Sequence, residues 1–175
     1  MFVPQAFTLG LISDTHGLLR EEALHLLAGV DHIVHAGDIG DPSILERLAA
    51  LAPVTAIRGN NDDAPWAEGL SETVTITLGG VLMHVVHSVN DLELDPSAKG
   101  VRVVISGHSH KPAIDQRGDV LFINPGSAGK RRFSLPLSVG RLVIEGSHLH
   151  PSILPITVPA SSPARRKQKL RDSGS

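Results

Sequence analysis

Short apolar runs and amphipathic stretches alternate along the first third of the chain. Phe7–Ser13, His32–Ala36 and Val54–Ile57 are apolar runs without a helical period, which is typical of buried strands. Between them, Leu18–Gly29 carries apolar residues on one helical face, and a second helix is predicted to begin at Asp41-Pro42, an N-cap followed by proline at the first helical position. The apolar stripe of this second helix consists of Ile44, Leu45, Leu48 and Leu51. The order β-α-β-α-β predicts parallel strands joined by crossover helices.

The second half of the chain has more antiparallel character. Thr73–Leu78 and Val81–Val86 flank Gly79-Gly80, a pattern that predicts a β-hairpin. Further strands are predicted at Val101–Ile105, Ala113-Ile114, Val120–Ile123 and Val139–Glu145, the last pairing with the segment near Ile153. The predicted fold class is therefore α/β, a two-sheet αββα sandwich with mixed parallel and antiparallel strands and with helices outside.

The chain is expected to form one domain, residues 1–158, followed by a tail. Residues 159–175 are rich in Ser, Pro, Arg and Lys and show no apolar period, so we expect a disordered basic tail there. The 175 residues suffice for one domain of ordinary size with a real core.

Composition narrows the function. The formal net charge is −2, which argues against a dedicated nucleic-acid binder. The chain has no cysteine, which excludes disulfides, thiolate metal sites and a cysteine nucleophile. The N-terminus lacks a secretory signal pattern, and no stretch approaches the roughly 20 apolar residues of a membrane span, so we expect a cytoplasmic protein without a membrane partner.

Residues with metal-ligand chemistry stand where successive predicted strands end. The carboxyl ends of strands in an open α/β sheet meet at one crevice, and the glycines beside these residues allow sharp turns. The sequence therefore predicts that one place collects seven ligands from five strand ends: Asp14 and His16, Asp38, Asn60, His87, and His108 with His110. Each fragment alone would also fit an ordinary turn, but together, in this order, they predict a metal centre.

These motifs resemble the calcineurin-like metallophosphoesterase family, whose pattern is Asp-x-His, Gly-Asp, Gly-Asn, a strand-end His and Gly-His-x-His. Asn124-Pro125-Gly126-Ser127 is similar to a motif of the small phosphodiesterase branch of that family. The resemblance implies that Asp38 bridges two divalent transition-metal ions. It implies the remaining ligands as Asp14, His16 and His110 for one ion, and Asn60, His87 and His108 for the other.

The resemblance also implies the chemistry, hydrolysis of a small phosphoester by a hydroxide held between the two ions. Mixed oxygen and imidazole ligands suit Mn, our first choice, and also Ni, Fe or Zn, and they disfavour Ca. Two such ions bind one phosphate and generate the nucleophile between them. A phosphodiesterase is our main reading. The alternatives are a phosphomonoesterase acting on a small metabolite, a nuclease, and a non-catalytic metal-binding scaffold protein; the oligomeric state is left open, a homodimer included.

Two positions depart from the wider family pattern. Asn60 and Asn61 occupy the catalytic position, but Asn61 stands where the family's Ser/Thr phosphatases have a His that protonates the leaving group, and a neutral amide does not titrate. Ser88 follows His87 where the family usually has Gly, which bears on the geometry of that loop.

The remaining polar residues are expected to have structural or solvent-facing roles. His84 lies three residues before His87 in a strand and should face the other side of the sheet, and His35 should be buried and hydrogen-bonded. The run Lys130, Arg131 and Arg132 is expected to be solvated, with contact to a second phosphate as the alternative.

Overall fold

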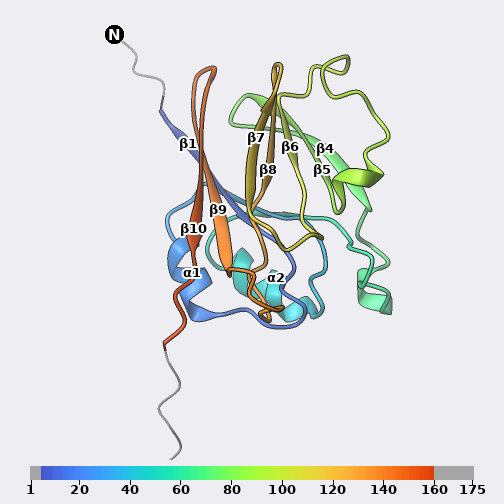
Figure 1. Cartoon of the computed structure of the whole chain (residues 1–175), viewed down its shortest axis with the longest axis vertical. Helices are drawn as coiled ribbons and strands as arrows, with labels where there is room; N and C mark the ends of the chain where they lie inside the picture. The colour runs from blue at the N-terminus through green and yellow to red at the C-terminus, as the bar shows by residue number, and fades with distance from the viewer. Residues whose placement is uncertain (1–4, 160–175) are drawn as a thin grey trace, which may run out of the picture.

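The first of two five-stranded sheets contains both ends of the folded chain (Figure 1). In this computed structural model, which describes residues 5–159, its strand order is β10-β9-β1-β2-β3. The strands span Phe7–Ile12 (β1), His32–His35 (β2), Val54–Ala56 (β3), Ser138–Glu145 (β9) and His148–Pro155 (β10). β1, β2 and β3 are parallel, as predicted, whereas β9 and β10 form an antiparallel hairpin beside β1 in which Ile153 faces Gly140, also as predicted. The predicted tail lies outside the described residues except for Pro159.

The second sheet has the order β4-β5-β6-β8-β7. Its strands span Thr73–Leu78 (β4), Val81–Val86 (β5), Val103–Ile105 (β6), Ala113–Arg117 (β7) and Val120–Asn124 (β8). The predicted hairpin between β4 and β5 is present, and Gly79 and Gly80 both have the positive φ angles that a two-residue turn requires. β5, β6 and β8 run parallel, so this half of the chain is less antiparallel than its sequence pattern suggested.

Two short helices pack on the outer face of the first sheet: α1 (Glu21–Leu27) and α2 (Pro42–Ala49). α2 begins as predicted, because Asp41 Oδ1 accepts the Ser43 N–H at 2.8 Å. α1 begins later than the apolar pattern indicated, since the Leu18 N–H donates to the Thr15 carbonyl in a preceding turn. Leu51, assigned to the stripe of the second helix, lies beyond the end of α2 and is 38% exposed. Neither helix is long or apolar enough to cross a membrane.

The main core lies between the two sheets, where β1 and β2 side chains pack against β5, β6 and β8. A second apolar cluster lies under α1 and α2, and a third, smaller one covers the outer face of the second sheet. Over that outer face the described residues contribute a segment with one 3-10 turn, Val89–Asp91, rather than an α-helix. Leu92 of this segment packs against the third cluster. A further 3-10 turn, Pro65–Ala67, precedes β4. The predicted α/β two-sheet sandwich is confirmed, with its helices on one face.

The loops at the carboxyl ends of the parallel strands are joined by backbone hydrogen bonds. Asp14 N–H donates to the Gly37 carbonyl at 3.0 Å and His16 N–H to the Asp38 carbonyl at 2.9 Å, which ties the loop after β1 to the loop after β2. In the second sheet, Gly107 N–H donates to the His87 carbonyl at 2.9 Å. These bonds hold the loops of each sheet in register at the edge where the candidate site lies.

Candidate metal centre

Two groups of acidic and histidine side chains meet at the carboxyl ends of the strands. In each group the potential ligand atoms lie within 4.8 Å of one another. The first group consists of Asp14, His16 and His110, and the second of Asp38, His87 and His108. Six of the seven predicted ligands are therefore brought together, in the grouping that the family resemblance implied.

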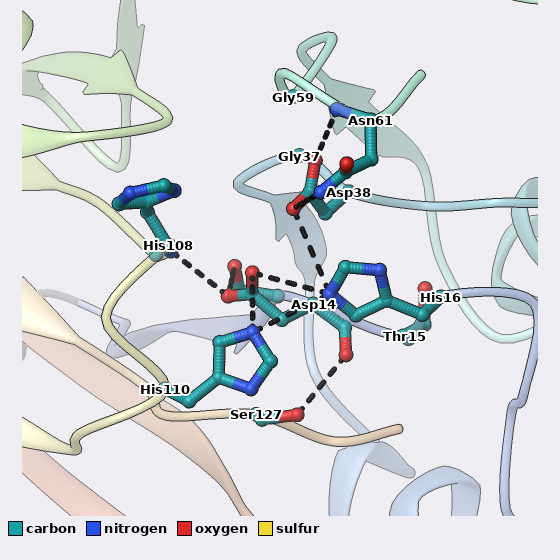
Figure 2. Close-up of polar contacts among 12 residues, drawn as sticks. Asp14, Thr15, His16, Gly37, Asp38, Gly59, Asn61, His108, His110 and Ser127 are labelled. Atoms are coloured by element: carbon teal, nitrogen blue, oxygen red, sulfur yellow. Dashed lines mark hydrogen bonds and ion pairs between the residues drawn. The ribbon is translucent and has the colours of Figure 1, made fainter. Parts of the chain in front are cut away.

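The first group converges on one point (Figure 2). Nε2 of His16 lies 3.3 Å from Nε2 of His110, and Oδ1 of Asp14 lies 3.3 Å from the His110 nitrogen and 3.8 Å from the His16 nitrogen. Two nitrogen ligands on one ion, each at about 2.0–2.1 Å, lie roughly 3.0–3.4 Å apart. The spacing of these three atoms is that of ligands to a common cation.

Asp38 lies between the two groups. Its Oδ2 atom is 3.2 Å from Nε2 of His87, in the second group, and 3.6 Å from Nε2 of His16, in the first. Asn60, the seventh predicted ligand, lies beside the second group, because its Oδ1 atom is 3.2 Å from Nδ1 of His108. The carboxylate that the resemblance implied as the bridge thus faces ring nitrogens of both groups.

Unpartnered polar atoms show that these residues fit a cation. Asp14 Oδ2 accepts hydrogen bonds from the Ser13 hydroxyl and from the His108 N–H, whereas its Oδ1 atom is buried with no hydrogen-bond partner among the described residues. His87 Nδ1 donates to the Ala36 carbonyl at 2.8 Å, so the neutral ring presents a lone pair at Nε2, which is also buried and unpartnered. A buried polar atom left without a partner costs about 1–3 kcal/mol, and a divalent cation in each group would satisfy the atom of that group.

The carboxylate between the groups is strongly held in its charged form. Burial opposes ionisation of Asp38, but the facing His87 ring and the two hydrogen bonds from Asn61 outweigh it and hold the pKa of Asp38 well below its ordinary value. Burial lowers the pKa of His87, but the nearby Asp38 carboxylate and the hydrogen bond to the Ala36 carbonyl raise it more, so the net shift is upward. The two carboxylates thus favour positive charge at this place.

The backbone is strained at the same residues. Five non-glycine residues of the two groups have φ angles in the left-handed region: Asp14 (55°), His16 (45°), Asp38 (54°), His108 (67°) and His110 (60°). Such a conformation costs about 1–3 kcal/mol per residue and persists only where the surrounding contacts impose it. Close approach adds to this constraint, since a Cβ on Gly59 would lie 2.2 Å from Asp38 Oδ1.

Asn61, predicted at the catalytic position, binds Asp38. Its N–H donates to Asp38 Oδ1 at 2.9 Å and its side-chain Nδ2 to Asp38 Oδ2 at 2.8 Å (Figure 2). The amide is therefore directed at the central carboxylate. Asn61 holds and orients Asp38 from two points.

Sequence reasoning gave no structural role to two buried residues that organise the site. Asp62, 3% exposed, accepts the N–H groups of Ile39 and Gly59 at 3.0 Å and of Gly40 at 2.9 Å, and so joins the loops after β2 and β3. The only feature of the sequence that pointed to Asp62 was its position directly after Asn60 and Asn61. Asn124, the first residue of the Asn-Pro-Gly-Ser motif, is the other.

The Asn-Pro-Gly-Ser motif forms hydrogen bonds to two of the loops that carry the ligand groups. Asn124 Nδ2 donates to the Gly107 carbonyl at 2.8 Å and to the Ser109 hydroxyl at 3.1 Å. Ser127 donates its hydroxyl to the Asp14 carbonyl at 3.1 Å (Figure 2). The motif thus connects the Gly-His-x-His loop to the Asp-x-His loop.

The two histidines expected to have structural roles, His35 and His84, each contact a threonine hydroxyl. His35 is fully buried; its Nδ1 accepts the Gly37 N–H at 3.2 Å, and its Nε2 contacts the Thr15 hydroxyl at 2.9 Å. Burial, above the effects of nearby charges, lowers the pKa of His35 to about 3, so the ring is neutral. His84 bonds Thr75 on the outer face of the second sheet, and burial lowers its pKa. Ser88 has φ −112°, a conformation any residue adopts, so the glycine of the family pattern is not needed here.

A cavity of about 830 Å³ opens beside the second group. Asn60, His84 and His87 are among its lining residues, and its walls come from the loop after β3, from β4 and β5, and from the segment after β5. Its charged lining residues are Arg58, which is paired with Glu72 at 2.8 Å, together with Asp91 and Glu93. The site therefore has room for an organic group next to the ligand cluster.

Paired carboxylate and imidazole clusters at the strand ends of a two-sheet α/β sandwich are the arrangement of metallophosphoesterases, hydrolases that act on phosphoester bonds. The sequence matches the calcineurin-like phosphoesterase superfamily domain over residues 7–147, and the chain belongs to this family.

Individual relatives agree with this class. The chain is 39% identical over 160 residues to a probable metallophosphoesterase of Methanocaldococcus jannaschii, covering 85% of this chain and 81% of that protein. It is 31% identical over 160 residues to phosphodiesterase YfcE of Escherichia coli, covering 74% of this chain and 84% of that protein. Among solved structures, Vacuolar Protein Sorting 29 of Cryptosporidium parvum has the same fold, with a TM-score of 0.69 at 18% identity over 87% of this chain and 99% of that one.

Proposed function

We propose that the protein is a two-metal phosphodiesterase acting on a small phosphoester. The observation that carries this proposal is the position of Asp38, whose one oxygen faces His87 in one ligand group and His16 in the other at 3.2 and 3.6 Å. Asp14, His16 and His110 would hold one ion, Asn60, His87 and His108 the other, and Asp38 both. When bound, two divalent ions supply Lewis acidity at the phosphate and lower the pKa of a water between them until it serves as the nucleophile.

The protein's own residues keep the site ready for this chemistry. Asp38 stays ionised across the neutral range because its pKa lies far below it, and the hydrogen bond from His87 Nδ1 to Ala36 keeps Nε2 available as a ligand. With two carboxylates against two divalent cations, the occupied centre carries net positive charge. That charge attracts a phosphodiester anion without a basic surface elsewhere.

Two features favour a diester over a monoester. Asn61 is bound to Asp38, so this position offers no group that could protonate a poor leaving oxygen. The cavity beside Asn60 and His87 gives space for a second ester substituent. A relative at 31% identity is named a phosphodiesterase, which supports the same reading.

Manganese is our proposed metal, ahead of Ni, Fe and Zn. The ligand set combines carboxylate and amide oxygens with imidazole nitrogens, a mixture that these ions accept and that Ca does not prefer.

The test is hydrolysis by protein reconstituted separately with Mn, Ni, Fe and Zn. We expect bis(p-nitrophenyl) phosphate to be hydrolysed with a kcat/KM at least about tenfold above that of p-nitrophenyl phosphate. Asp38→Ala should abolish turnover and bound metal, whereas Asp119→Ala, an exposed aspartate at the far end of β8, should retain both.

Other outcomes identify the rival functions. A preference for the monoester would support the phosphomonoesterase. Full metal occupancy without hydrolysis of either ester, or failure to bind two ions, would support a non-catalytic scaffold. The likeness to Vacuolar Protein Sorting 29 is a likeness of fold alone and does not by itself favour this function.

A further inference from the structure

A basic loop lies against the first ligand group, on another side from the large cavity. The loop begins at Gly129, where an added Cβ would lie 2.2 Å from the Thr15 carbonyl oxygen. Arg20 Nε donates to the Gly129 carbonyl at 3.3 Å, and Ala128 N–H donates to the Ser13 carbonyl at 3.1 Å. These contacts fix the start of the loop against the backbone that carries Asp14 and His16.

Three consecutive cations follow this fixed point. Lys130, Arg131 and Arg132 are all exposed, and none forms an ion pair with a residue in the described part of the chain. The run follows directly on Gly129, where an added Cβ would lie 2.2 Å from the Thr15 carbonyl oxygen and 2.7 Å from the Asp14 carbonyl oxygen. The cations thus border the first ligand group, whereas the cavity beside the second group carries Asp91 and Glu93.

An aromatic side chain ends the basic run. Phe133 is 95% exposed, the most exposed large apolar residue described, and its φ of 54° makes it the one left-handed non-glycine residue outside the two ligand groups among those described. A turn in which Leu135 N–H donates to the Arg132 carbonyl at 3.1 Å closes the loop behind it. The ring is therefore presented to solvent directly after the three exposed cations, in a loop whose start lies against the backbone of the first ligand group.

We propose that the loop of residues 130–133 is a second substrate subsite, which binds an aromatic ring on Phe133 and a further phosphate on Lys130, Arg131 and Arg132. The substrate class is then a nucleotide-type phosphodiester that carries a second phosphate. Arg and Lys bind phosphate through charge-assisted hydrogen bonds, and nucleobases stack on exposed aromatic side chains. The proposal rests on the phosphodiesterase function proposed above.

A solvated basic run explains the charges but leaves the exposed aromatic ring unexplained. An anionic membrane surface also attracts cations beside an aromatic residue. The position of residues 130–133 favours a substrate over a membrane, because Gly129 is held against the loop that carries Asp14 and His16, where the reacting phosphate must bind. In addition, one phenylalanine offers little apolar area to a bilayer.

Three chromogenic diesters with one leaving group separate the contributions. Methyl p-nitrophenyl phosphate has neither ring nor second phosphate on its retained side, thymidine 5′-(p-nitrophenyl phosphate) adds the base, and thymidine 3′-phosphate 5′-(p-nitrophenyl phosphate) adds both. In each reaction water forms a new P–O bond, the P–O bond to nitrophenolate breaks, and the proton of the water passes to solvent. We expect the 3′-phosphate to raise kcat/KM about tenfold or more.

The variants assign this gain to the loop. Lys130→Ala combined with Arg131→Ala should remove most of the gain from the 3′-phosphate, and Phe133→Ala should lower kcat/KM for both thymidine diesters about 5- to 20-fold. All should hydrolyse methyl p-nitrophenyl phosphate as the wild type does. Arg102→Ala, an exposed arginine at the start of β6, is the matched control and should leave all three rates unchanged.

Equal kcat/KM for the two thymidine diesters in the wild type would overturn the phosphate assignment. A Phe133→Ala effect as large on the methyl diester as on the thymidine diesters would overturn the stacking assignment. Both results leave the phosphodiesterase function intact as long as the methyl diester is hydrolysed. Should no diester be hydrolysed, calorimetric binding of thymidine 3′,5′-bisphosphate, weakened by the loop variants but not by Arg102→Ala, still decides the inference. If the protein sediments with anionic vesicles in a way that depends on Phe133, and shows no preference for the thymidine diesters, the subsite proposal is overturned in favour of a membrane contact.

Discussion

Asp62 should be one of the most destabilising residues to replace, although it does not contact either ligand group. Its carboxylate accepts three backbone N–H groups at 2.9–3.0 Å, and two of these bonds, from Ile39 and Gly59, are buried. A hydrogen bond to a charged acceptor contributes about 1.5–3 kcal/mol net, and some of that loss is recovered where water reaches the vacated space. We expect Asp62→Ala to lower the free energy of unfolding by about 3–5 kcal/mol, a large part of the 5–15 kcal/mol that is typical of a domain.

Urea unfolding of the metal-free protein, followed by circular dichroism, measures this loss. The neighbouring Asp63→Ala is the matched control, because Asp63 is exposed and its replacement should change the free energy of unfolding by no more than about 0.5 kcal/mol. Asp62→Asn should fall between the two, since its amide keeps one acceptor oxygen but turns a donor toward another N–H. The loss should also weaken metal binding about 10- to 100-fold, because the joined loops carry Asp38 and Asn60. If Asp62→Ala and Asp63→Ala unfold within about 1 kcal/mol of each other, the carboxylate does not join the loops in solution and the reasoning fails.

Three further predictions follow from the site. The pKa of His35 is about 3 in the folded protein and 6.5 in the unfolded chain, so the stability that its neutral ring contributes is present above pH 6.5 and is lost on acidification by up to about 1.4 kcal/mol per pH unit. Urea unfolding at several pH values should show a steeper loss of stability for wild type than for His35→Gln, and equal slopes would contradict the assignment. His87→Ala should lose about one bound ion by elemental analysis while His84→Ala keeps both, and equal losses would mean that the site is wrongly located. Aryl diesters should be hydrolysed about 10²–10⁴-fold faster than alkyl ones, and Asn61→His should reduce that ratio; a flat leaving-group dependence in wild type would show that another group is the acid.

The ligand residues were predictable from sequence because their chemistry coincides with strand ends. Asp14, His16 and Asp38 follow apolar runs whose parallel arrangement is imposed by the β-α-β-α-β order, so their convergence needs no knowledge of packing. The side-chain hydrogen bond from Asn61 to Asp38 was not predictable from sequence, since it depends on the conformation of the loop after β3. The same holds for Asp62, whose role depends on which backbone donors surround it.

The remaining differences concern features that only tertiary structure decides. The parallel pairing of β5, β6 and β8 comes from long connections, which carry no short-range pairing signal. The late start of α1 follows from a turn anchored to the metal loop at Thr15, and Leu51 is exposed because α2 ends two residues before it. Apolar periodicity indicates the existence of a helix more securely than its ends.

Each ligand group draws its members from both sheets. Asp14 and His16 follow β1 and Asp38 follows β2 in the first sheet, whereas His87 follows β5 and His108 and His110 follow β6 in the second. Along the rest of the interface the sheets meet through apolar contacts, which tolerate small displacements at moderate cost. Coordination bonds tolerate far less, so ions bound in the two groups, as proposed above, would fix the separation of the sheets at this edge to a few tenths of an ångström. Substitutions in the core between the sheets, such as at Met83 or Ile105, would therefore alter metal affinity without touching a ligand, and the metal as well as stability would limit sequence drift in that core.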